Sequence, residues 1–389
     1  MKKIIMLLVF VSALTFGISA SAQAYNVTFC FDWDKNFTDA GYGDYFLDNS
    51  SHQLARGVYV QIEERQGLFS WAVVEEGHAL YDGCYDADLT YNNRYRITLF
   101  ADSLIDSNHV KGINPDYDDL HYQVVSSILG FNLTSNYYEF VYNYLTAHKT
   151  SNVMAVGTRA MTVARNGVNN DTIYYITEEP PSGGCGGYSD GDRAVRTSST
   201  CRDEKFVIAH ETGHFFNYAY VGHTGIYTGC DSYNNPVYCP SSGSHSWHSQ
   251  ENQGCAAKEG FANFYSALLF NTPSLTTCDY GSNDCVTMER YLFNYCHPNP
   301  YLIGYFDALG VESDWTQFYW NLYSNHADVQ EDWQSPAIFA SLWEDTAPWD
   351  DTHMDVYENF LSATTTWGGN YEDDFETIAN CNSHACVGW

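Results

Sequence analysis

Basic residues are scarce in this 389-residue chain, which has 17 Lys and Arg against 48 Asp and Glu and a formal net charge of −31 at pH 7. So acidic a chain repels nucleic acid and anionic membrane surfaces, which argues against both as partners. The sequence has no C-x-x-C pair, so a zinc site built from cysteines is disfavoured. It also has no repeat of fixed period and, beyond its N-terminus, no apolar run long enough to span a membrane.

Residues 1–24 have the features of a secretory signal peptide. Lys2 and Lys3 precede an apolar run, and Ala22-Gln23-Ala24 supplies an A-x-A cleavage site. The run is shorter than the roughly 20 residues that cross a bilayer, which disfavours the alternative of a membrane anchor. We therefore expect a mature chain that begins at Tyr25 and is secreted to the extracellular space or the periplasm.

Twelve cysteines follow the predicted signal peptide, and an even number in an exported chain predicts disulfides. Their connectivity does not follow from spacing alone. Three pairs are close in sequence and are expected to join local loops: Cys230–Cys239, Cys278–Cys285 and Cys381–Cys386. We also expect Cys30–Cys84 within the first domain and Cys185–Cys201 just before the helix predicted around residue 210.

The chain is long enough for two domains. Residues 25–112 contain short runs rich in aromatic and β-branched residues, separated by turn residues, which predicts an antiparallel β-sandwich. The order of these features resembles transthyretin-like and carboxypeptidase-regulatory-like sandwiches, a resemblance of pattern only. Residues 113–120 are predicted to be a linker to a second domain over 121–389.

Within the second domain the hydrophobic pattern predicts a helical stretch over 121–148. Strand signals follow at 153–156, 172–177 and 194–197. The last of these leads into the segment that carries the chemistry.

An apolar segment contains an H-E-x-x-H motif formed by His210, Glu211 and His214, and the upstream pair Thr200 and Asp203 is typical of a helix start. Residues four apart share one helix face, so both imidazoles can bind a single zinc ion. Glu211 lies beside them, where it can reach a water at the metal. The alternative is a chance pair of histidines on a buried helix, which would leave their nitrogens in need of partners.

A catalytic zinc needs a third protein ligand. The metzincin continuation is excluded, because Asn217 and Tyr220 occupy the places of its Gly and His. Residues 256–264 predict a second helix, whose small residues allow close packing and on which Glu259 and Asn263 share a face. We expect Glu259 to bind zinc and Asn263 to orient a ligating histidine. The alternative ligands are Asp231, His245 and His248.

Over residues 150 to 280 the sequence resembles the gluzincins, the thermolysin-like zinc metallopeptidases, in its HETGH motif and its later E-x-x-A-N helix. The resemblance implies an α+β zincin-like catalytic domain with a mainly helical C-terminal half. It implies His210, His214 and Glu259 as ligands and Glu211 as the base. It also implies that the strand at 194–197 lines the cleft and pairs with the substrate backbone. The spacing departs from the family, since Glu259 follows His214 by 45 residues, more than in thermolysin itself.

These residues predict a secreted zinc metallopeptidase in which Glu211 is the general base, acting on a protein or peptide substrate. His353 is a candidate donor to the developing oxyanion. Two alternatives remain open: an exported binding or adhesion protein with a non-peptidase or inactive zinc site, and a zinc hydrolase of a non-peptide amide or ester. The presence of Glu211 argues against the first, because a purely structural zinc needs no base.

Overall fold

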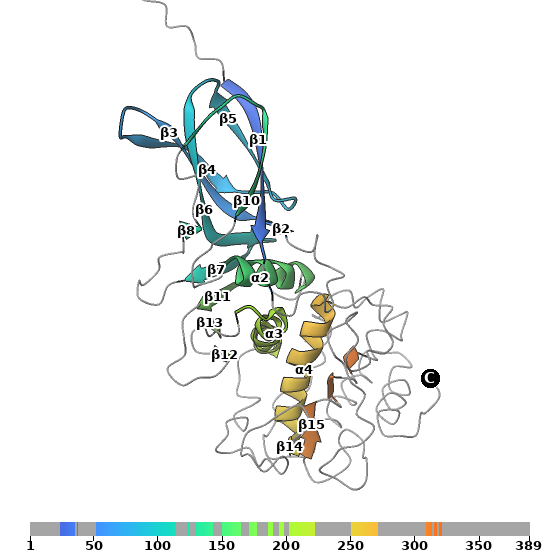
Figure 1. The fold of residues 1–389 in the computed structure, drawn as a ribbon. Coiled ribbons are helices and arrows are strands. Elements are labelled where there is room, and N and C mark those ends of the chain that lie inside the picture. The colour runs from blue at the N-terminus through green and yellow to red at the C-terminus, as the bar shows by residue number, and fades with distance from the viewer. Residues whose placement is uncertain are drawn as a thin grey trace, which may run out of the picture.

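The computed structural model describes a β-rich chain with mixed sheets and few helices (Figure 1). None of the helices that it describes is long and apolar enough to cross a membrane. The residues described are 24–35, 37, 52–113, 123–124, 130–142, 150–164, 171–176, 186–189, 194–197, 202–221, 250–270, 309–312, 315–316 and 319–320.

The smaller of the two main sheets is built around β1, which pairs in parallel with β10 and antiparallel with β5 and β2. Its strands are β1 (Ala24–Asp34), β2 (His52–Leu54), β5 (Cys84–Thr90) and β10 (Tyr137–Tyr142). Apolar residues alternate along β1 and face the core, as a strand with one buried face requires: Val27, Phe29, Phe31 and Trp33.

The larger sheet has the order β12-β13-β11-β7-β6-β3-β4, with β8 and β9 also pairing with β6. It is mixed, because β11 runs parallel to both β7 and β13 while the other pairs are antiparallel. Strands from both sides of the predicted linker therefore share one sheet. Its strands are β3 (Val58–Arg65), β4 (Trp71–His78), β6 (Arg94–Ile105), β7 (Asn108–Ile113), β8 (Gln123–Val124), β9 (Phe131–Asn132), β11 (Thr172–Ile176), β12 (Gly186–Ser189) and β13 (Ala194–Thr197).

Helix α2 (Thr150–Ala164) packs against β6 and β7 and also contacts α3 (Lys205–Val221). The approach to the sheet is close at Gly157, where a Cβ would lie 2.6 Å from the Tyr175 ring and 2.7 Å from Val110. Helix α4 (Gln253–Phe270) packs on α3 and directly follows β14 (Gln250–Asn252), which pairs with the later strand β15 (Leu309–Val311). In Figure 1, α2, α3 and α4 lie at the end of the larger sheet formed by β7, β11 and β13.

The strands expected within 25–112 are confirmed in β1, β3 and β6, and those expected at 172–177 and 194–197 in β11 and β13. The helix expected over 121–148 is wrong in its described part, which contains β8, β9 and β10. In β10 the rings of Tyr138 and Phe140 stack on Phe29, while the intervening Glu139 is exposed. This alternation is that of a strand pairing with β1.

The strand expected at 153–156 is also wrong, because these residues belong to α2. All four are fully buried, and a short apolar run buried on every side has no period that separates a strand from a helix. The predicted mainly helical half beyond α4 falls largely outside the described residues.

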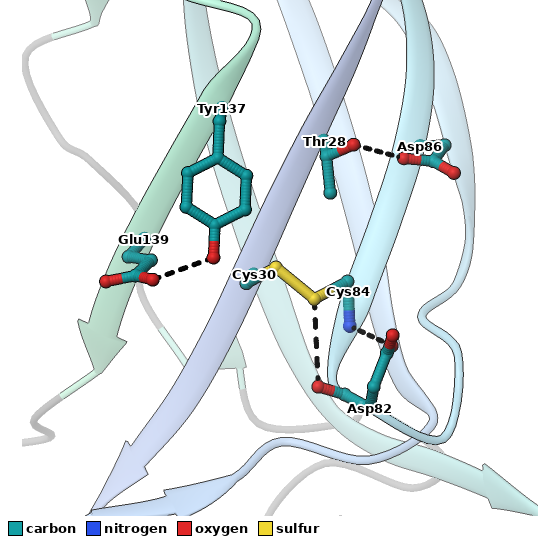
Figure 2. Close-up of a disulfide and its surroundings, with 7 residues drawn as sticks. All are labelled: Thr28, Cys30, Asp82, Cys84, Asp86, Tyr137 and Glu139. Carbon is teal, nitrogen blue, oxygen red and sulfur yellow. Dashed lines mark hydrogen bonds between the residues drawn. A yellow bond between two sulfur atoms is a disulfide. The ribbon is translucent and has the colours of Figure 1, made fainter.

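The disulfide predicted between Cys30 and Cys84 is confirmed (Figure 2). The two residues are direct partners in the register of β1 and β5, with their Cα atoms 4.0 Å apart. Beside them, the Thr28 hydroxyl donates to Asp86 Oδ1 over 2.6 Å across the same strand pair. The other four predicted pairings involve cysteines outside the described residues.

Replacing both Cys30 and Cys84 with Ala should lower the free energy of unfolding of the smaller sheet by about 2–4 kcal/mol, because the bond closes a loop between residues 54 positions apart. Chemical denaturation, followed by a probe of this sheet, measures the change. Thr28→Ala is the matched control, since it removes an exposed polar contact from the same strand pair and should cost less than about 1 kcal/mol. Equal effects of the two changes would contradict the prediction.

Candidate metal centre

Helix α3 holds His210 and His214 one turn apart on the same face. The helix is anchored by buried apolar residues, among them Ile208, Ala209 and Phe215. It is also tied to the sheet, because the buried Tyr175 hydroxyl of β11 lies 2.8 Å from Thr212 Oγ1. Burial raises the pKa of Tyr175 well above its usual value, and the contact with Thr212 offsets this only in part.

Helix α4 packs closely on α3 at Gly213, inside the H-E-x-x-H motif. A Cβ at Gly213 would lie 2.8 Å from the Cα of Ala262 and 3.1 Å from its carbonyl oxygen. The Ser266 hydroxyl lies 3.3 Å from the carbonyl oxygen of Phe206, joining the same two helices. This contact brings Glu259 of α4 up to the two histidines.

His210, His214 and Glu259 converge where the two helices meet. Nε2 of His210 lies 3.2 Å from Nε2 of His214 and 3.2 Å from Oε2 of Glu259. Nε2 of His214 lies 3.1 Å from the same oxygen. Three potential ligand atoms thus form a nearly equilateral triangle, and these residues could hold a metal ion. His214 and Glu259 are buried, and His210 is partly exposed.

A hydrogen bond from α4 orients the first of these imidazoles. Nδ1 of His210 lies 2.7 Å from Oδ1 of Asn263, and because that oxygen can only accept, the ring nitrogen donates. When the ring is neutral, Nε2 of His210 is therefore the nitrogen that offers its lone pair to the triangle. Nδ1 of His214 is buried and has no hydrogen-bond partner among the described residues.

The charges around the triangle favour a cation. Burial lowers the pKa of His210, but the hydrogen bond to Glu259 and the negative charges of Glu211, Glu259 and Glu312 outweigh it and raise the pKa to about 9. Burial likewise raises the pKa of Glu259, and the neighbouring His214 and His210 hold it well below its usual value. The raised pKa of His210 and the lowered pKa of Glu259 both show that this place favours positive charge, as a metal cation requires.

Glu211 is half-buried beside His210, and its charge acts on that imidazole. Sequence reasoning missed Glu312, a buried acid whose charge also reaches His210. Glu312 directly follows β15, which pairs with β14, the strand directly before α4, and this pairing places Glu312 near His210. No spacing in the sequence encodes that pairing. The remaining predicted candidates lie outside the described residues: Asp231, His245, His248 and His353.

The strand at 194–197 does not have the free edge that the resemblance implied. β13 pairs with β11 on one side and with β12 on the other, so both of its edges are occupied, and its predicted pairing with a substrate backbone is wrong. β12, which sequence analysis did not identify as a strand, ends the sheet on this side among the described strands.

A second group that could hold a metal ion lies in the larger sheet and was also missed by sequence reasoning: His78, Asp102 and His109.

No family model, curated protein or solved structure matches this chain.

Replacing Gly213 with Ala should weaken metal binding and destabilise the chain by about 1–3 kcal/mol, although Ala is the better helix former. The added Cβ meets the backbone of Ala262, which cannot rotate away, so α3 and α4 must separate. Thermal unfolding and a metal-competition titration measure the two effects. Gly67→Ala is the control, since its Cβ meets only the side chain of Ser70. Unchanged metal affinity in Gly213→Ala would contradict the prediction.

The affinity of this centre for a divalent cation should rise with pH up to about 9. Because the pKa of His210 is raised to about 9, its ring is protonated at pH 7 in the metal-free chain. A cation must displace that proton before Nε2 can bind it, so binding at pH 7 should release about one proton. Calorimetric titration in buffers of different ionisation enthalpy counts the protons, and a count of zero would refute this.

Proposed function

We propose that this protein is a zinc-dependent metallopeptidase in which His210, His214 and Glu259 hold the metal and Glu211 is the general base. The observation that carries the proposal is the triangle of ligand atoms 3.1–3.2 Å apart. Glu211, which is not part of this triangle, directly follows His210 in the chain. Two imidazoles and one carboxylate are the donor set of a catalytic zinc that keeps a position open for water.

The residues fit a zinc ion in size as well as in chemistry. A tetrahedral zinc with bonds of about 2.0–2.1 Å separates its ligand atoms by about 3.3–3.4 Å. The three separations in the chain are within a few tenths of an ångström of that value, so small side-chain shifts suffice. Asn263 supports the assignment, because ligating imidazoles commonly donate their second N–H to a fixed oxygen.

The proposed roles of the residues follow from their charge and position. When bound, zinc supplies a Lewis acid that brings the pKa of a water toward about 7 and polarises the scissile carbonyl. Glu211 accepts a proton from the attacking water and delivers it to the leaving amine. This proton transfer needs a carboxylate that lies beside the ligands but is not itself a ligand. Asn263 holds the imidazole of His210, and Glu312 adds negative charge next to it.

The resemblance to the gluzincins supports the same interpretation, since that family combines an H-E-x-x-H motif with a glutamate on a later helix. We propose that the chain acts outside the cytoplasm on protein or peptide substrates. The signal-peptide features of residues 1–24 and the disulfide between Cys30 and Cys84 support an exported location.

Glu211→Gln should retain the metal and lower peptide hydrolysis by about 100-fold or more, because the base is lost while all three ligands remain. Digestion of a peptide library, with and without a zinc chelator, measures activity, metal dependence and cleavage preference. Glu204→Gln is the matched control, since this partly exposed glutamate directly precedes α3 and lies outside the metal centre. Full activity in Glu211→Gln, or chelator-resistant cleavage by the unaltered chain, would overturn the proposal.

A further inference from the structure

A second cluster of metal-binding side chains lies in the larger sheet. His78 ends β4, Asp102 lies in β6 and His109 lies in β7. One ring nitrogen of each histidine and one carboxylate oxygen of Asp102 lie within 4.8 Å of one another. The two imidazole rings meet edge to face, with centroids 5.8 Å apart.

Strand register explains why three residues from different strands converge. In the β6–β7 hairpin, Asp102 pairs with Lys111 and Leu104 with His109, so Asp102 and His109 are diagonal neighbours on one face. Toward β3 the register shifts, because Val58 pairs with Ser103 but Tyr59 pairs with Phe100. Asp102 is thus one of two extra residues in a bulge, a device that commonly re-aims a side chain.

Both imidazoles are held in place through Nδ1. Nδ1 of His78 lies 2.8 Å from the carbonyl oxygen of Gly57, so the ring donates there and its Nε2 keeps a lone pair. The same carbonyl accepts from the backbone N–H of Leu104 over 2.8 Å, which fixes it in the bulge. Gly57 has φ +64°, and a Cβ there would lie 2.0 Å from the Leu104 carbonyl oxygen, so only glycine fits.

Asp102 is the buried acid of the cluster. Its Oδ1 lies 2.8 Å from Nδ1 of His109, and its Oδ2 lies 3.6 Å from Nζ of Lys111. The ammonium of Lys111 opposes a metal cation at Asp102, but its flexible side chain can move that charge away.

We propose that His78, Asp102 and His109 form a second metal site, one that binds a divalent transition ion with a preference for nitrogen ligands, such as Zn²⁺. Two imidazoles with one carboxylate select such ions over Mg²⁺ or Ca²⁺, which prefer all-oxygen sites. The ion joins β4, β6 and β7 and thereby stabilises the larger sheet. This site lies apart from the centre on α3 and α4, and its existence does not depend on the proposed peptidase activity.

The test uses the full chain with His210→Ala and His214→Ala, which removes the first centre. After metal is stripped, the protein is titrated with Co²⁺, followed by visible absorption, and with Zn²⁺ against a chromophoric chelator. We expect one equivalent to bind and the thermal midpoint to rise by a few degrees. Adding His78→Ala and His109→Ala should weaken binding about 100-fold or more, whereas His52→Ala, a histidine of β2, should not.

Lys111→Gln, which removes the competing ammonium and leaves all three ligands, should tighten binding in the same background. A chain with its first centre intact that carries only His78→Ala and His109→Ala should still bind one equivalent of metal and hydrolyse peptides. This result separates the present inference from the proposed function. Circular dichroism establishes that each variant is folded. The proposal is overturned if the first-centre variant binds no Co²⁺ or Zn²⁺, or if removing His78 and His109 leaves its affinity unchanged.

Discussion

The close packing of α3 on α4 at Gly213 is the contact on which the candidate metal centre depends. The absence of a side chain there lets the backbone of Ala262 approach to van der Waals distance. Only at that separation does a glutamate on α4 reach two imidazoles on α3, with all three ligand atoms 3.1–3.2 Å apart. The contacts of Glu259 with both histidines, which help to raise the pKa of His210, follow from this approach.

The helix pair is in turn held by the larger sheet. Helix α2 lies against β7 and β11 at Gly157, and the Tyr265 hydroxyl of α4 donates to the carbonyl oxygen of Ala160 in α2 over 2.8 Å. From the sheet itself, Tyr175 reaches Thr212, two residues from both histidines. The ligands are therefore mounted on rigid elements that share one core, which is what a site of fixed geometry requires.

Sequence reasoning succeeded where the signal was local and strongly periodic. It placed the H-E-x-x-H motif and the later glutamate on helices, and it located β1, β3, β6, β11 and β13. It was wrong in the described part of 121–148, where the alternating burial of Tyr138 and Phe140 is that of a strand. It was wrong at 153–156, where burial on every side removes the period, and about the free edge of β13, which depends on a strand elsewhere in the chain.

By itself, the sequence determined that His210 and His214 share a face and that Glu211 lies beside them, because a four-residue spacing on a helix is a matter of local geometry. It also indicated Glu259 and Asn263 as residues sharing a helix face. Only the tertiary structure decided that these two meet the histidines, that Glu312 adds its charge, and that His78, Asp102 and His109 converge. These contacts depend on helix packing, strand register and a bulge. Because they join residues far apart in the chain, no fixed spacing in the sequence predicts them.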